Sequence, residues 1–188
     1  MSVERVLIGV ALILGLAVGY LIARGRRRGR RSERPDEIHR ILLPFTGTAI
    51  SRRAVDAALR LARAENAVLM PAYLAEVPKQ LPLDCAIPAE ASKAMPMLEA
   101  IEQRATAQDV AVDARVERGR SYRHALQRLL EHEDFERVVV PASGGQGAGL
   151  SGDDLVWLLE KAPTEVLILR PGPGDERIVS ATGARGPS

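Results

Sequence analysis

Residues 137–171 read RVVVPASGGQGAGLSGDDLVWLLEKAPTEVLILRP, and this stretch decides the class of fold. It opens on one short apolar run, Arg137–Pro141, and ends with a second, Glu165–Leu169. Between the two runs lie a glycine-rich loop, residues 144–152, and a segment of helical character, residues 153–161. A strand, a helix and a second apolar strand in this order predict a right-handed parallel β-α-β unit.

The same alternation fills the chain upstream of this unit. Further strands are predicted at Arg40–Phe45, residues 67–77 and residues 110–116, and further helices at residues 51–64, 89–108 and 121–133. Continuously apolar strands are typical of parallel sheets buried on both faces. We therefore predict an α/β fold with a doubly wound five-stranded parallel sheet in the order 3-2-1-4-5. Ligands of such folds bind beyond the carboxyl ends of the strands, here at residues 46–48 and 143–152.

The N-terminus has a different character. From Val6 to Ala23 the chain reads VLIGVALILGLAVGYLIA, eighteen residues without a charge. As a helix it would be about 27 Å long, close to the hydrocarbon thickness of a bilayer. We predict a transmembrane anchor at residues 1–24 that holds the protein in the inner (plasma) membrane. A cleaved signal peptide would need a basic segment before the apolar run, and only Arg5, offset by Glu4, precedes it.

Charge sets the expected orientation of this anchor. Residues 24–40 hold eight arginines against three acidic residues, whereas the chain from Ile41 onward has a net charge of −3. Arginines just after a span stay in the cytoplasm, so residues 25–37 are predicted to be a basic juxtamembrane linker and the following domain to be cytoplasmic. The domain lacks the basic composition of a nucleic-acid binder. Residues 172–188, rich in glycine and proline, are predicted to be a disordered tail.

Several pieces in sequence order resemble the universal stress protein family. They are ILLPFTGT at residues 41–48, Gly119 after the third predicted strand, VVVPASGGQG at residues 138–147 and APTEVLILRP at residues 162–171. We predict a universal-stress-protein-like domain at residues 38–171. The resemblance itself covers about residues 40–171 and implies the doubly wound fold. Related stress proteins dimerise through the last strand, so it also implies a homodimer through Glu165–Leu169, whose apolar edge lacks a partner in this strand order.

ATP-binding members of that family carry Gly-2x-Gly-9x-Gly-Ser/Thr after the fourth strand. Here Gly144 and Gly147 match the first half, but the later glycine position falls on Trp157. The loop is shorter, and Asp153 follows its last glycine, where the family has a hydroxyl residue. Thr46 stands in place of the family's aspartate, which removes a carboxylate from the nucleotide site. The candidate loop residues are Thr46, Gly47, Thr48, Gly144, Gly147, Gly149 and Gly152. We expect no cofactor, with ATP as the one candidate.

No catalytic or metal site is predicted. Ser143 has no Gly-x-Ser-x-Gly around it, and Cys85 is the only cysteine. The expected function is a non-catalytic, membrane-anchored module in stress response or signalling, acting through partner binding or self-association at the cytoplasmic membrane face. Three alternatives stay open: an adenine-nucleotide sensor with a degenerate glycine loop, an accessory domain of a membrane transporter, and a nucleotide hydrolase.

Overall fold

The computed structural model describes residues 39–142, 149–170, 172 and 174–179. Five parallel strands form its main sheet: β1 (Arg40–Phe45), β3 (Val68–Glu76), β4 (Arg115–Gly119), β5 (Arg137–Pro141) and β6 (Glu165–Leu169). Their order is β4-β3-β1-β5-β6. If only these five strands are numbered in the order of the sequence, their order in the sheet is the predicted 3-2-1-4-5. The labels differ because a short strand, β2 (Ala49–Ser51), follows β1.

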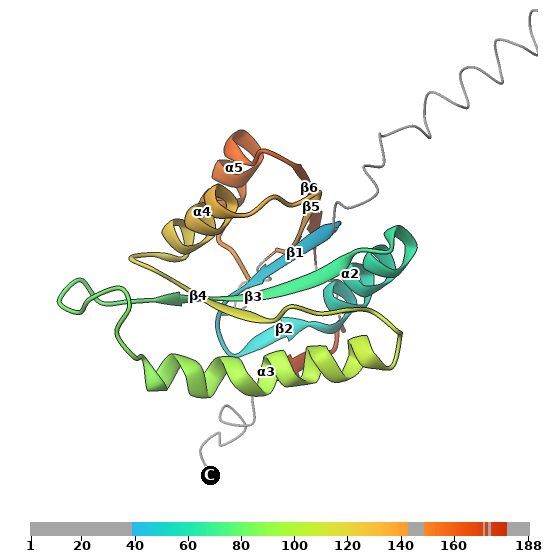
Figure 1. Ribbon diagram of the computed structural model, residues 1–188, viewed down its shortest axis with the longest axis horizontal. Coiled ribbons are helices and arrows are strands. Elements are labelled where there is room, and N and C mark those ends of the chain that lie inside the picture. The colour runs from blue at the N-terminus through green and yellow to red at the C-terminus, as the bar shows by residue number, and fades with distance from the viewer. Residues whose placement is uncertain (1–38, 143–148, 171, 173, 180–188) are drawn as a thin grey trace, which may run out of the picture. The chain divides into compact units, whose positions relative to one another are not determined.

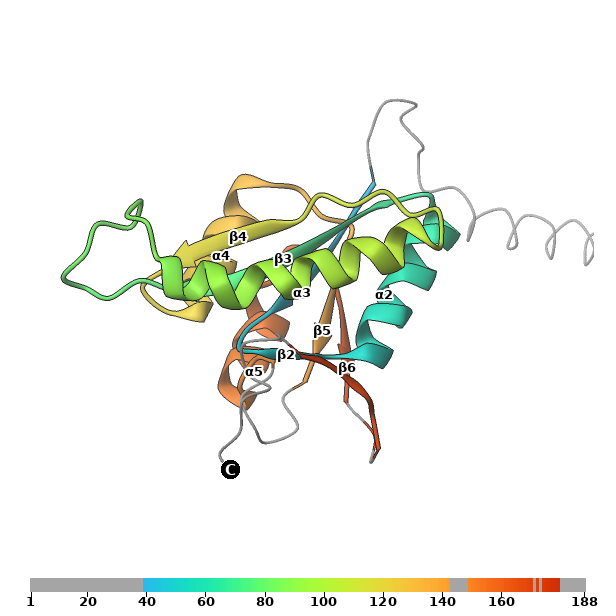
Figure 2. The ribbon, with the colours of Figure 1, turned by 90° about the horizontal axis from the view of Figure 1, so that it is seen from below.

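Helices cover both faces of this sheet, as a doubly wound fold requires. They are α2 (Arg52–Glu65), α3 (Pro88–Thr106), α4 (Tyr122–His132) and α5 (Gly152–Lys161). Figures 1 and 2 show α2 and α3 on one side of the sheet and α4 and α5 on the other. The buried side chains accordingly form two clusters, one under each pair of helices.

A serine begins three of these helices. The hydroxyls of Ser51, Ser121 and Ser151 each accept a hydrogen bond from the backbone N–H three residues later, at 3.1, 3.2 and 3.2 Å. Such N-caps satisfy one of the N–H groups that a helix leaves without an internal partner. The caps place the first turns of α2, α4 and α5 directly after the loops at the carboxyl edge of the sheet.

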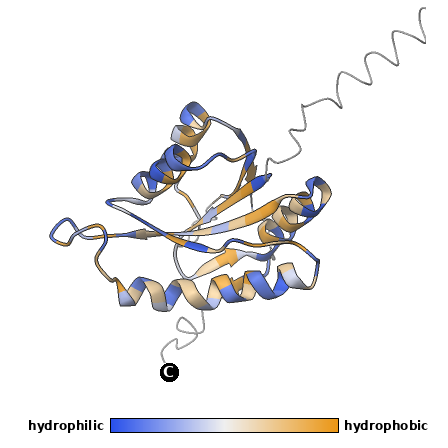
Figure 3. Ribbon diagram, in the orientation of Figure 1, coloured by the Kyte–Doolittle hydropathy of each residue, from blue (hydrophilic) through white to orange (hydrophobic). Residues whose placement is uncertain are grey.

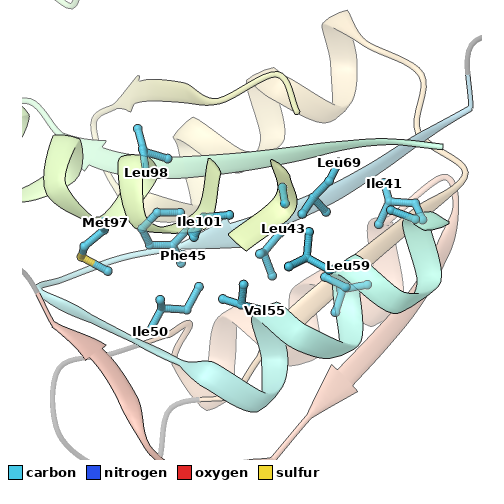
Figure 4. Close-up of a cluster of buried hydrophobic side chains, with 14 of the residues drawn as sticks. Ile41, Leu43, Phe45, Ile50, Val55, Leu59, Leu69, Met97, Leu98 and Ile101 are labelled. Atoms are coloured by element: carbon cyan, nitrogen blue, oxygen red, sulfur yellow. The ribbon is translucent and has the colours of Figure 1, made fainter. Parts of the chain in front are cut away.

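The core explains why the strands read as apolar runs. Figure 3 colours most of β1 and β3 as hydrophobic, and Figure 4 shows the cluster beneath α2 and α3. There Phe45 of β1, Leu59 of α2 and Ile101 of α3 are fully buried. The neighbours of Leu42 in the sequence, Ile41 and Leu43, belong to the same cluster as Phe45. Leu42 itself belongs to the second cluster, beneath α4 and α5. Successive residues of one strand thus enter both cores.

Two predictions about the sheets need correction. The third strand was expected at residues 110–116, but β4 spans Arg115–Gly119, and Val112 makes only an isolated bridge to Leu69. The strand is charged because it lies at an edge of the sheet. The tail prediction is wrong for β7 (Arg177–Val179), which pairs antiparallel with β2.

Among the described residues, no helix is long and apolar enough to cross a membrane. The predicted anchor between Val6 and Ala23 and the basic linker at residues 25–37 lie outside the described residues.

Candidate functional site

Two of the loops singled out from the sequence meet at the carboxyl edge of the sheet. The hydroxyl of Thr46, which follows β1, donates a hydrogen bond of 3.1 Å to the carbonyl oxygen of Gly149. Thr46 is buried, with 3% of its surface exposed. Gly47 and Gly149 have φ angles of 76° and 98°, in the region that favours glycine. The Thr46 hydroxyl therefore ties the two loops together.

The remaining candidate residues are spread around this contact. Thr48 is exposed, and Gly152 is the first residue of α5. A Cβ built on Gly152 meets no atom within 4 Å, so packing within the described chain does not require glycine there. Gly144 and Gly147 lie outside the described residues.

The acidic residues after the loop differ in their surroundings. Asp153 is exposed, whereas Asp154 accepts hydrogen bonds from the side chains of Arg123 and Ser151 at 3.0 and 2.6 Å. The Arg123 guanidinium also lies 5.8 Å from the ring centre of Trp157. Arg123 is thus paired with an internal carboxylate in the first turn of α5 and lies over an aromatic ring of the same helix. This arrangement disfavours phosphate binding, because a phosphate would compete with Asp154 for Arg123 and face Asp153.

A buried tyrosine cluster links β3 to α3, and the sequence reasoning missed it. The Tyr73 hydroxyl donates to Glu90 at 2.8 Å, and Lys93 donates to the other Glu90 oxygen at 2.6 Å. Burial, followed by the hydrogen bond to Glu90, raises the pKa of Tyr73 well above its usual range. Burial would also raise the pKa of Glu90, but hydrogen bonds from Lys93 and Tyr73 outweigh it and lower this pKa. Tyr73 therefore stays protonated at neutral pH and braces α3 as a structural group.

The turn between β4 and α4 depends on Gly119. A Cβ on this residue would lie 2.3 Å from the backbone nitrogen of Ala125. The next residue, Arg120, reaches back to the carbonyls of Pro78 and Leu81 at 2.6 and 2.8 Å. Its backbone N–H donates to Nδ1 of His124 at 3.0 Å. His124 is half-buried, so this hydrogen bond ties its ring to the turn.

The universal stress protein family matches residues 37–170, which is more than half of the sequence. The chain belongs to the universal stress protein family. Gly119, the Thr46–Gly149 contact and β6 all lie within the matched region. A search of curated proteins finds no match.

Solved structures of other family members share this fold. A universal stress protein family protein from Burkholderia pseudomallei is 20% identical, with a TM-score of 0.50, over 69% of this chain and 94% of that one. A universal stress protein in complex with cAMP is 21% identical, with a TM-score of 0.50, over 72% and 98%. A family protein from Arabidopsis thaliana with AMP bound is 12% identical, with a TM-score of 0.53, over 73% and 99%. At these identities the likeness shows the fold alone.

The two edges of this universal stress protein sheet differ in chemistry. β4, with the sequence RVERG, carries charged side chains, and Arg128 donates to the carbonyl of Arg118 at 3.3 Å. β6, with the sequence EVLIL, leaves Leu167 and Ile168 each 37% exposed. An apolar hollow lies beside β6 and is lined by Ala57, Arg60, Leu61, Ala64, Val139, Leu167 and Leu169. The apolar edge is therefore at β6.

Within the described residues there is no group of three or more histidine, cysteine, aspartate or glutamate side chains placed to hold a metal ion. Cys85 is a free, partly exposed thiol.

Proposed function

We propose that this chain is a membrane-anchored, non-catalytic universal stress protein that acts in stress response or signalling through self-association and partner binding. The observation that supports it best is the apolar edge strand β6. A protein that works by binding itself needs a complementary surface, and an apolar strand at the edge of a sheet is a template for pairing with a second copy.

The backbone of β6 offers two residues for this pairing. The N–H of Ala142 donates to the carbonyl of Leu169 at 2.9 Å, so Leu169 directs its backbone groups toward β5. Because these directions alternate along a strand, Val166 and Ile168 direct theirs away from β5. A second copy of β6 running antiparallel could hydrogen-bond to both residues. The homodimer through Glu165–Leu169 follows from this geometry as a proposal.

The helix that precedes β6 carries exposed apolar side chains of its own. Val156 and Leu159 of α5 are 57% and 60% exposed, the two most exposed large apolar residues of the described chain. In the sequence they precede β6 by one loop. Burying such side chains against a second copy would contribute about 25 cal/mol for each Å² of apolar surface.

The proposed membrane anchor rests on the sequence. The uncharged stretch from Val6 to Ala23 and the arginines after it would hold the domain at the cytoplasmic face of the inner membrane. Confinement near one plane would raise the effective concentration of two β6 edges. A membrane protein, such as a transporter for which this chain is an accessory, is a further candidate partner. Mass spectrometry of the complex after gentle solubilisation tests for it.

The dimer is tested with chains that start at residue 37, where the family match begins. Light scattering should give twice the monomer mass. Ile168→Pro removes an N–H that points away from β5 and should yield monomers, whereas Ile168→Ala keeps the N–H and should retain a weaker dimer. Parent chains that stay monomeric at high micromolar concentration would refute pairing through β6.

A second candidate function is adenine-nucleotide sensing. It is favoured by the contact between the Thr46 and Gly149 loops and by relatives whose structures contain cAMP or AMP. The pairing of Arg123 with Asp154 argues that binding is weak. Calorimetry with ATP, AMP and cAMP tests it: a micromolar Kd, about −8 kcal/mol, would establish the sensor and refute our expectation of weak binding.

A further inference from the structure

The chain continues past the family's domain and folds back on it. The family matches residues 37–170, yet the strap, residues 174–179, is described and includes β7. Its strand pairs antiparallel with β2, with Ile50 opposite Ile178 and Ser51 opposite Arg177. Ile178 packs against the core cluster beneath α2 and α3. The strap is therefore an added strand seated against β2 and the start of α2, and the surface that it covers, residues 49–53, is called the groove.

Acidic residues of the strap sit against a basic helix end. The Ser51 hydroxyl, which caps α2, donates to the Asp175 carboxylate, and Arg52 pairs with Glu176. The backbone N–H of Arg52 also donates to the Glu176 carbonyl at 2.9 Å. Arg53 lies farther away, with Nε 3.9 Å from Asp175. Two arginines and the positive end of the helix dipole thus face two adjacent carboxylates.

The fit of Asp175 is incomplete. Only 4% of its side chain is exposed, yet its Oδ1 atom has no hydrogen-bond partner among the described residues. Nε of Arg53 lies 3.9 Å from the same oxygen, which is ion-pair distance but too long for a hydrogen bond. A buried carboxylate oxygen without a hydrogen-bond donor costs stability, and this ion pair offsets the cost only in part. The strap therefore occupies an anion-binding groove without satisfying its own buried acid.

We propose that this groove is a receptor for an extended acidic segment of a partner protein, and that the strap is an internal ligand which the segment displaces. Recognition would combine main-chain pairing with β2, an acidic pair against Arg52 and Arg53, and an apolar side chain at the place of Ile178. The groove does not include β6, so this proposal stands independently of the dimer.

The strap protects the groove because it is covalently attached. A tethered segment competes at a high effective concentration, so a partner binds only when its own segment fits better or the strap is weakened. The unpartnered oxygen of Asp175 leaves room for such a better fit. Access of a partner to the groove is consequently controlled by how stably the strap is bound there.

The experiment uses the full chain in lipid nanodiscs. Asp175→Arg combined with Glu176→Arg places cations against Arg52 and Arg53 and should release the strap. The probe is a fluorescent peptide, Gly-Asp-Glu-Arg-Ile-Val, and the matched control peptide, Gly-Asn-Gln-Arg-Ile-Val, keeps the arginine but lacks the two carboxylates. The acidic peptide should bind the released chain at least tenfold more tightly than it binds the original chain. On the released chain it should also bind at least tenfold more tightly than the amide control peptide. Adding Arg52→Gln and Arg53→Gln should remove this preference.

Hydrogen exchange gives a second readout that does not need the released variant. On the original chain, saturating acidic peptide should speed amide exchange at Ile178, while the amide of Ile50 stays protected. Equal binding of the two peptides to a released chain, or unchanged exchange at Ile178 under saturating peptide, overturns the proposal. Strap protection that rises with protein concentration also overturns it, because the groove would then take the strap of a second copy.

Discussion

Replacing Gly119 by alanine should destabilise this protein through one misplaced methyl group. The new Cβ would lie 2.3 Å from the nitrogen of Ala125, 2.8 Å from its Cα and 2.7 Å from the carbonyl oxygen of Ser121. Ordinary contacts of a Cβ begin at 3.4 Å. All three neighbours are backbone atoms, so no side-chain rotation can relieve the overlap. The first turn of α4 would have to move away from the end of β4.

The size of the effect follows from how firmly that turn is held. Overpacking a core typically costs 1–3 kcal/mol. Because Ser121 caps α4 and Ala125 is fully buried, we expect the upper end, about 3 kcal/mol. For a domain of this size, each kcal/mol lowers Tm by roughly 2–4 °C. The predicted decrease in Tm is therefore roughly 6–12 °C.

Urea and thermal unfolding of chains that start at residue 37 provide the measurement. Gly152→Ala is the matched control, because a Cβ there meets nothing within 4 Å and the residue is helical. Alanine at that site should change stability little or raise it by about 0.4–1 kcal/mol. If Gly119→Ala unfolds within 2 °C of the original chain, roughly the effect of 1 kcal/mol or less, the turn is not packed as described and the reasoning fails.

Two charged groups give further predictions. Glu133 accepts from Arg40 at 2.6 Å and from Arg115, so Glu133→Gln should cost about 1 kcal/mol in urea unfolding, while Glu131→Gln, on the exposed side of α4, should have little effect. If Glu133→Gln lowers the free energy of unfolding no more than Glu131→Gln does, the ion pairs of Glu133 with the two arginines do not contribute to stability. Burial raises the pKa of Glu117 above its ordinary value, so the folded chain binds that proton more tightly than the unfolded chain does and ionisation costs stability as pH rises. Glu117→Gln should therefore stabilise the fold at pH 7 but not below about pH 4, where the carboxyl group is protonated in both states. A stabilisation that persists at low pH would show that the buried charge of Glu117 is not its cause.

The sequence by itself determined the main sheet. The runs RILLPF, RVVVP and EVLIL became β1, β5 and β6 with the predicted bounds. β1 and β5 lie inside the sheet, and strands buried on both faces must be apolar at nearly every position. β6 is an edge strand that is apolar although it is partly exposed. The helices were predictable for a related reason, since their apolar spacing marks the buried face. Both properties are local, so a linear sequence displays them.

The charged edge strand β4 and the short strands β2 and β7 were harder to predict than the apolar strands. β4 is charged, so the apolar residues before it drew the prediction to residues 110–116. β2 and β7 have only three residues each and are far apart in the chain. Nothing local favours either as a strand, and they exist because the fold brings them side by side.

The candidate site divides in the same way. Sequence spacing identified the loops around Thr46 and Gly149 as neighbours at one edge of the sheet. Only the tertiary structure decided that Thr46 donates to Gly149, that Arg123 is held by Asp154, and that Asp175 lies buried at the start of α2. These are contacts between side chains and groups 31 to 124 residues apart. Such pairings depend on where the packed helices and strands place each group, and no local pattern of residues encodes that.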